Sequence, residues 1–294
     1  ATFSLTETCN GATALVSGDS GGVFTFNPAP GDGATIDSNT GQVTNGVTGS
    51  TYTIEYSVCA NSSTVNLTAN NNNCFTMLDD ATTYVVDGEN CVQLTAAQND
   101  QTGCAWSGES IDFSNNFTLS LDYYFGNNPG GADGTTFAFT PNPGSCGSNG
   151  AQLGAGGLSN TLIIEFDTYD NDGSSSNDLS CDHIAIEIDG DLPDDPSNFP
   201  SNDPPLAGPI CANSDASSIE DGSTHDITIN WDAATQTLGV YFDGNLRLSC
   251  TNDFITNVFG GQSEIFWGAT GATGGFNNQQ YFCPSTVVVL PTEI

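Results

Sequence analysis

The chain has 294 residues, with 35 Asp and Glu against a single basic side chain, Arg247, so its formal net charge is −34. A surface with this charge repels phosphate backbones and anionic headgroups, which argues against nucleic acid and bare membranes as partners. The 34 glycines, 13 prolines and short apolar runs between turn clusters are typical of an all-β protein, and the length suits two domains.

Ten cysteines are spread along the chain without a C-x-x-C pair. This usage predicts disulfides formed in an oxidising compartment and not zinc ligands, so we expect a secreted or cell-surface protein. No charged and then apolar leader opens the sequence. No apolar run reaches the length of a membrane span either, so direct membrane insertion is not expected.

Residues 1–69 consist of short alternating segments with turn-rich sequence between them, which predicts a small sandwich. Cys9 and Cys59 lie near the two ends of this unit. We predict that they pair, which would stabilise the small core by about 3 to 4 kcal/mol in the chain-entropy model. The alternation puts large apolar side chains on one face of each predicted strand: Phe24 and Phe26 in one, and Tyr52, Ile54 and Tyr56 in a later one.

The pattern GGVFTFNPAPGDGATIDSNTGQV, continued by STYTIEYSV, resembles the immunoglobulin-like repeats of large adhesins from gliding, type IX-secreting bacteria. This resemblance implies a spacer module without chemistry of its own. The polar run TANNNN follows, and we place the domain boundary there, so that residues 70–294 form the second domain.

From Cys74 onward, short strands recur at regular spacing, which predicts a sandwich of two large antiparallel sheets in one domain. We interpret Trp106, Trp231 and Trp267 as core residues and His225 as a strand residue near a turn. The predicted strands are CVQLTA, FTLSLDYYF, TTFAFT, TLIIEFDTY, HIAIEID, HDITINW, TLGVYFDG and SEIFWGAT.

Polar and apolar residues alternate in the two predicted strands at 162–169 and 183–189. In the first strand, the apolar face goes to the core, and Glu165, Asp167 and Tyr169 share the other face. If the strands are antiparallel neighbours, His183 lies beside the two carboxylates. The inward residues are Leu162, Ile164, Phe166, Ile184, Ile186 and Ile188, and the second strand's other face carries His183, Ala185, Glu187 and Asp189.

The loop between these strands is rich in oxygen ligands. Calcium takes six to eight oxygens, whereas a borderline metal such as manganese accepts carboxylates with one imidazole. The spacing does not match an EF-hand, because Thr168 and Leu179 would take the first and twelfth positions. Residue types alone leave a metal site and an uncomplexed acidic loop as alternatives. The loop residues are Asp170, Asn171, Asp172, Asp178 and Asp182.

The motif E-F-D-T-Y-x-N, followed by an Asp five residues before H-I-x-I, is similar to the metal-binding segment of legume, or L-type, lectins. The resemblance implies a concanavalin-like jelly-roll sandwich for residues 70–294. It also implies calcium held by Asp167, the Tyr169 carbonyl, Asn171 and Asp178, and a second, Mn2+-like ion held by Glu165, Asp167, Asp178 and His183. The loop is two residues longer than in the plant proteins.

Two further segments resemble the sugar-binding loops of this family. GADGTTFAF matches a segment whose aspartate, here Asp133, accepts hydrogen bonds from two sugar hydroxyls. NGAQLGAGG matches a glycine loop that donates a backbone N–H, which points to Gly150 or Ala151. With these, Asn171 would donate an amide N–H and Tyr169 would cover the apolar face of the sugar. The C-terminal part is similar to L-type lectin modules of bacterial surface adhesins.

The strand order that the resemblance implies suggests two disulfides in the second domain, Cys91 with Cys104 and Cys74 with Cys283. Eight cysteines allow 105 pairings, so residue types alone leave the pattern open.

The function expected is a calcium-dependent glycan-binding module of a secreted or cell-surface bacterial adhesin, not an enzyme, with glycans and neighbouring modules or subunits as partners. A glycoside hydrolase is one alternative, but the third acid of its E-x-D-x-E pattern is replaced by Tyr169. The second strand offers Glu187, Asp189 and Asp191, although it ends near Gly190. A structural subunit of a filament or surface layer is another, since the C-terminal VVVLPTEI could pair with a neighbour's sheet.

Overall fold

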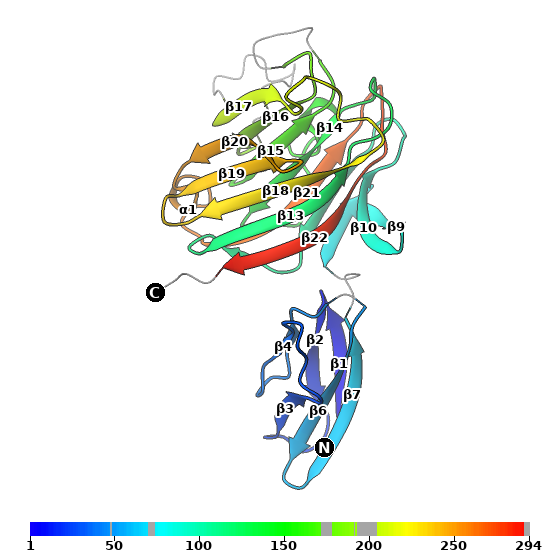
Figure 1. Ribbon diagram of the computed structural model, residues 1–294, viewed down its shortest axis with the longest axis vertical. Coiled ribbons are helices and arrows are strands. Elements are labelled where there is room, and N and C mark those ends of the chain that lie inside the picture. Colours follow the sequence, from blue (N-terminus) through cyan, green and yellow to red (C-terminus); the bar gives the residue numbers. More distant parts are fainter. Residues whose placement is uncertain (48, 70–73, 172–177, 191, 193–204, 291–294) are drawn as a thin grey trace. The chain divides into compact units, whose positions relative to one another are not determined.

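The structure is a computed structural model that describes residues 1–47, 49–69, 74–171, 178–190, 192 and 205–290 (Figure 1). Contacts divide the chain into two compact units, Ala1–Phe75 and Thr76–Ile294. The boundary expected at residue 70 falls among residues 70–73, outside the described part. Both units are built of strands, which confirms the all-β class.

The first unit consists of two small antiparallel sheets. The β6 strand alternates buried and less buried residues, so Tyr52, Ile54 and Tyr56 all face the core as predicted. Phe24 packs on Tyr56 with ring centroids 4.5 Å apart. One sheet has the order β1-β2-β5-β4 (Phe3–Thr8, Gly11–Val16, Val43–Thr44, Thr35–Ile36), and the other has the order β3-β6-β7 (Val23–Phe26, Thr51–Val58, Asn61–Thr68).

The disulfide of the first unit joins Cys9 to Cys74, so the predicted Cys9–Cys59 pair is wrong. Cys59 lies exposed in the turn between β6 and β7. The end of β7, in contrast, returns to Cys9. A Cβ on Gly46 would contact both Ala69, just after β7, and the Asn10 carbonyl beside Cys9. The end of β7 therefore lies close to Cys9, whereas Cys59 lies in the turn at the other end of β7.

The second unit is a sandwich of two antiparallel sheets, as predicted (Figure 1). The seven-stranded sheet has the order β20-β19-β18-β13-β22-β10-β9 (Asn245–Thr251, Thr237–Phe242, Thr224–Asp232, Asn116–Tyr124, Gln280–Leu290, Glu89–Thr95, Thr82–Val86). The other sheet has the order β17-β16-β15-β14-β21-β11-β8 (Ala207–Cys211, His183–Ile188, Leu162–Asp167, Gly134–Thr140, Glu264–Ala272, Thr102–Ser107, Phe75–Asp79), with β12 (Ile111–Asp112) paired to β21. The described residues add a 3-10 turn, η1 (Gly150–Gln152), and one short helix, α1 (Phe254–Asn257).

An aromatic core lies between the two sheets of the second unit. Phe113 contacts four rings, among them Trp231, whose Nε1 donates to the Phe113 carbonyl at 2.8 Å. Trp106 and Trp267 are also buried, so the prediction that all three tryptophans are core residues is confirmed. His225 is a buried β18 residue, as predicted, within hydrogen-bond distance of Asp243.

The C-terminal strand β22 pairs inside its own sheet. Val287 lies opposite Leu119 of β13, and Leu290 lies opposite Asn116. Residues 291–294, the end of the VVVLPTEI segment, lie outside the described part. The backbone of the described portion of this segment is thus hydrogen-bonded to β13.

Three disulfides lie within the second unit, and neither predicted pair is among them. Cys91 joins Cys283 because Val92 lies opposite Phe282, which places the two cysteines side by side on β10 and β22. Cys104 of β11 joins Cys146. The third bridge, Cys181–Cys211, spans 30 residues. The pairs Cys91–Cys104 and Cys74–Cys283 are therefore wrong.

Two thiols remain unbridged, and they differ in burial. Cys59 is exposed, whereas Cys250 is buried, and burial raises the pKa of the Cys250 thiol. Because the thiolate is the reactive form, we expect a thiol reagent to modify one cysteine in the native protein and two after denaturation without reductant. Mass spectrometry after alkylation checks this. Absence of a reactive thiol in the native protein would contradict the Cys9–Cys74 bridge.

Candidate functional site

The predicted ligands Asp167 and His183 lie directly opposite each other on neighbouring strands. The antiparallel pairing of β15 with β16 is confirmed, and on its other side Asp167 lies opposite Gly134 of β14. Gly134 in turn lies opposite Ala272 of β21. Because cross-strand partners share a face, these four residues form one row across the sheet, and Glu165 lies one step away on the same face.

This face of the sheet is buried, although it carries charged residues. Glu165, Asp167 and His183 are each 1% exposed, and every β15 residue is buried on both sides of the sheet. The cover is the segment 145–158, which we call the covering loop. An apolar cluster that includes Ile163 fills the space beneath it.

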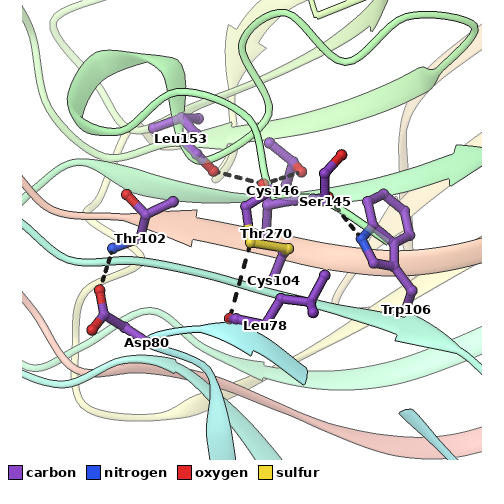
Figure 2. Close-up of a disulfide and its surroundings, with 10 residues drawn as sticks. Leu78, Asp80, Thr102, Cys104, Trp106, Ser145, Cys146, Leu153 and Thr270 are labelled. Atoms are coloured by element: carbon purple, nitrogen blue, oxygen red, sulfur yellow. Dashed lines mark hydrogen bonds between the residues drawn. A yellow bond between two sulfur atoms is a disulfide. The ribbon is translucent and has the colours of Figure 1, made fainter. Parts of the chain in front are cut away.

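Three contacts hold the covering loop on the sheet, as Figure 2 shows. The Cys104–Cys146 disulfide ties its start to β11, and Trp106 Nε1 donates to the Ser145 carbonyl at 3.0 Å. Thr270 Oγ1 of β21 donates to the Leu153 carbonyl at 2.6 Å. The loop is thus fixed at its start and in its middle.

The covering loop, which carries Gly150 and Ala151, packs through Leu153 against Gly134, the residue after Asp133. Gly150 and Ala151 belong to η1, which is followed by Leu153 in a left-handed conformation. A Cβ on Gly134 would lie 3.3 Å from Leu153 Cδ2, so the leucine side chain sits on the residue that follows Asp133. The two sequence-predicted sugar-binding segments therefore meet at the start of β14.

Asp133 is held by its backbone and packed against a glycine. Its N–H donates to the Ala272 carbonyl at 3.0 Å, and its carbonyl accepts from Thr168 N at 3.0 Å and Thr168 Oγ1 at 3.2 Å. The peptide bond between Ala132 and Asp133 is cis. A Cβ on Gly274 would lie 3.1 Å from Asp133 Oδ2, so the carboxylate lies against the loop that follows β21.

The predicted calcium ligands gather where β15 ends. Tyr169 N donates to Asp167 Oδ1 and Asn171 N donates to Asp178 Oδ2, both at 2.6 Å. Asn171 Oδ1 is buried and accepts no hydrogen bond from the described residues. An amide oxygen beside two carboxylates is a donor set that suits calcium. Residues 172–177, which include Asp172, lie outside the described part.

The described residues contain no group of three His, Cys, Asp or Glu side chains gathered closely enough to hold a metal ion. An ion at the end of β15 would therefore depend on amide and carbonyl oxygens in addition to carboxylates. The chain's only guanidinium does not take that place, because Arg247 Nη2 donates to the Cys211 carbonyl at 2.6 Å.

An aromatic pair forms the exposed side of the site. Tyr169 stacks on Phe276, with ring centroids 5.4 Å apart and an interplanar angle of 27°. Phe276 is 54% exposed and lies on the same loop as Gly274. Sequence reasoning missed Phe276. The available signal was a large apolar side chain alone in the polar, glycine-rich segment GATGGFNN.

Sequence reasoning also missed the contact between Asn278 and Glu220, which form a buried polar pair. Asn278 Nδ2 donates to Glu220 Oε1, and both side chains are buried. Burial and the negative charge of Asp182 raise the pKa of Glu220 to about 8, while the hydrogen bond from Asn278 acts in the opposite direction. Burial also raises the pKa of Asp182. The sequence offered no signal for this pair, because its members lie far apart in the chain.

A family model described as the legume lectin beta-barrel domain matches residues 65–286. The match covers most of the chain, so this chain belongs to the legume-lectin, or L-type lectin, family. The family and the jelly-roll sandwich expected from the E-F-D-T-Y-x-N segment are thereby confirmed. Among the described residues, no helix is long and apolar enough to cross a bilayer.

Relatives among known proteins include a bacterial adhesin. The serine-rich adhesin for platelets of Staphylococcus aureus is 28% identical over 207 residues, which is 64% of this chain and 9% of that adhesin. The version from strain MRSA252 is 41% identical over 85 residues, or 27% of this chain and 6% of the adhesin. The chain thus spans less than a tenth of the length of these relatives.

Solved structures share the fold of the second unit. The lectin from Bauhinia forficata in complex with GalNAc has a TM-score of 0.58 and 18% identity, covering 75% of this chain and 94% of that lectin. The exoplasmic/lumenal domain of VIP36, bound to Ca2+ and Man3GlcNAc, has a TM-score of 0.55 and 15% identity, covering 76% of this chain and 86% of that domain. These similarities establish a common architecture.

The raised pKa of Glu220 predicts how stability depends on pH. Since the folded state holds this proton up to about pH 8 and an unfolded glutamic acid releases it near 4.5, the free energy of unfolding falls as pH rises between these values. Glu220→Gln should remove this loss of stability. In the parent protein we expect the loss to be on the order of a few kcal/mol at most. Denaturant unfolding of the parent and of Glu220→Gln, in chelator at pH 4.5 and pH 8, checks this prediction. Equal losses of unfolding free energy in the two proteins would contradict it.

Proposed function

We propose that the second unit is a calcium-dependent carbohydrate-binding module of a secreted or cell-surface bacterial adhesin, which attaches to glycans without turning them over. The observation that carries the proposal is the meeting of Asp133, the covering loop and the segment from Tyr169 to Asn171 at one end of the eight-stranded sheet. These pieces come from distant parts of the chain and match, in order, the sugar-binding segments of the family.

Each piece supplies one kind of contact that a monosaccharide needs. The Asp133 carboxylate accepts hydrogen bonds from two hydroxyls, and the Asn171 amide donates one. A backbone N–H of Gly150 or Ala151 donates another. The Tyr169 ring covers the apolar C–H face of the sugar, and Phe276, stacked on it, widens this surface.

Calcium would be held by Asp167, Asp178, the Tyr169 carbonyl and Asn171 Oδ1. Bound there, the ion supplies positive charge and fixes the surrounding loop. The buried Asn171 oxygen supports this assignment because a polar atom of this kind is costly to bury without a partner. Holding Asn171 and Tyr169 in place before the sugar arrives lowers the entropy cost of binding.

A second, Mn2+-like ion would use the imidazole of His183. Its ligands in the proposal are Glu165, Asp167, Asp178 and His183, of which Asp167 and His183 face each other across β15 and β16. All four side chains are buried, but in the described structure they are not gathered closely enough to hold an ion, so this part of the proposal requires them to close around it. An ion held there would offset charge inside the protein.

The proposed ligand is an uncharged glycan. A protein with a net charge of −34 repels sialylated or sulfated sugars. The only basic side chain that could pair with an anionic sugar, Arg247, instead contacts the Cys211 carbonyl. The site itself offers a carboxylate, amides and aromatic rings, which suit hydroxyl and N-acetyl groups.

Catalysis is not part of the proposal. A retaining glycosidase needs two carboxyls about 5 Å apart on the strand, and Tyr169 stands where a further acid would be required. The second candidate run, from Glu187, leaves the strand at once, because β16 ends at Ile188 and Asp189 has a φ of 59°. Asp191 lies outside the described residues.

The first unit is proposed to be an immunoglobulin-like spacer. Its core is apolar and aromatic throughout. An adhesin that repeats such spacers together with lectin units would present several sugar sites at once. Binding through several sites strengthens attachment when each site is shallow.

Loss of calcium should abolish glycan binding, and loss of the Asp133 carboxylate should weaken it strongly. We expect glycan-array binding in calcium, none in chelator, and no release of sugar products in either. Asp133→Ala should weaken affinity by about a hundredfold or more, because it removes two charged hydrogen bonds that contribute roughly 1.5 to 3 kcal/mol each. Asp19→Ala, an exposed aspartate of the first unit, is the control. Full affinity of Asp133→Ala would disprove the site, and product release would favour a hydrolase.

Charge on the glycan should decide binding. We expect neutral galactose- or N-acetylhexosamine-terminated glycans to bind better than the same glycans carrying sialic acid, and salt to narrow the difference by screening the repulsion. Paired glycans compared on one array at low and high ionic strength test this. Preferential binding of the sialylated member would refute the uncharged-ligand proposal.

A further inference from the structure

Asn278 lies on the same loop as Phe276, but its side chain turns inward and is 2% exposed. Its amide nitrogen donates to the Asn128 carbonyl at 3.0 Å and to Glu220 Oε1. Both amide protons are thus used, by two segments that are remote in sequence. A buried amide with both protons engaged holds those segments in a defined place.

The turn before Asp133 is shaped around this amide. A Cβ on Gly126 would lie 2.2 Å from Asn278 Cγ, and a Cβ on Gly131 would lie 2.1 Å from Asn278 Nδ2. Neither position has room for any other residue. The turn therefore wraps the Asn278 side chain closely on two sides, and it ends only two residues before Asp133.

The backbone of Asn278 is anchored to the opposite sheet. Its carbonyl accepts from Thr95 Oγ1 at 3.1 Å, and the same hydroxyl lies 3.0 Å from Gln280 Oε1. Thr95 and Gln280 are fully buried. The loop carrying Phe276 thus leaves β21 and returns to β22 with Asn278 fixed at its inner end.

Glu220 links this amide to the other side of Asp133. Its carboxyl interacts with the Thr168 hydroxyl, and Thr168 donates to the Asp133 carbonyl through both its N–H and its hydroxyl. Asp133 is consequently held through the preceding turn, which Asn278 fills, and through its own carbonyl, which Thr168 contacts. Neither Asn278 nor Glu220 is exposed to a ligand.

We propose that Asn278 is a positioning residue of the sugar site: with Glu220 as its partner, it sets the direction of the Asp133 carboxylate without touching the sugar. The inference rests on the proposed function. The inference adds to that proposal by naming the residue that positions Asp133, the acceptor for the sugar hydroxyls. Positioning matters because a misplacement of about 1 Å is enough to lose such hydrogen bonds.

The test compares Asn278→Ala with Gln279→Ala. Gln279 is the matched control, because it is the next residue and its amide donates to Gln93, away from Asp133. We expect Asn278→Ala to lower affinity for the array-identified glycan about tenfold or more, while the affinity for calcium alone, measured by titration calorimetry, stays within about twofold. Gln279→Ala should match the parent in both. Equal glycan affinity of Asn278→Ala and the parent overturns the inference.

A second pair of variants separates positioning from loss of fold. Asn278→Asp keeps the shape of the side chain but removes both amide N–H donors, to Glu220 and to the Asn128 carbonyl, so glycan affinity should fall. Adding Glu220→Gln restores a donor opposite the new acceptor and should recover at least part of the affinity. Failure of the double variant to improve on Asn278→Asp, with both proteins folded by thermal unfolding, would overturn the inference.

The crystal structure of Asn278→Ala decides the inference without a glycan. We expect the Asp133 carboxylate to move by about 1 Å or more relative to the parent. An unmoved carboxylate overturns the positioning role. A parent protein that binds no glycan overturns the proposed function instead, so the two failures are distinguishable.

Discussion

The pairing of Asp167 with His183 on one side and Gly134 on the other is the constraint on which the site depends. It puts the end of β15, the start of β16 and the start of β14 at one end of the sheet. Asp133 then lies one residue beyond the pairing, and Asp170, the first residue of the acidic loop, lies three residues beyond Asp167. A shift of one residue would turn every ligand to the opposite face, so the register that forms the sandwich also forms the site.

The site buries negative charge. The chain carries a net charge of −34, yet Glu165, Asp167 and Asp178 are almost fully buried. Carboxylates in such surroundings are costly unless hydrogen bonds or cations offset them. The chain has one guanidinium, and it lies elsewhere. A divalent ion that fixes the loop would also offset this charge, which joins stability to binding.

Particular residues show how far sequence reasoning reached. The alternation of apolar and polar residues placed Tyr52, Ile54 and Tyr56 in one core, because successive side chains on a strand point to opposite faces. The same alternation indicated that β15 and β16 pair. It did not foresee that the second face of β15 is buried, since the covering loop is held there by a disulfide, Trp106 and Thr270. The disulfide predictions failed for a similar reason: cysteines pair across strands and turns whose neighbours are set by topology.

The sequence by itself determined the all-β class, the family and the chemical types at the site, because these follow from strand period, turn composition and a short ordered motif. Only the tertiary structure decided which side chains meet. Phe276 reaches Tyr169, and Asn278 fills the turn before Asp133, through loops more than a hundred residues apart in the chain. The physical reason is that such contacts depend on sheet register and loop path, which local propensities do not encode.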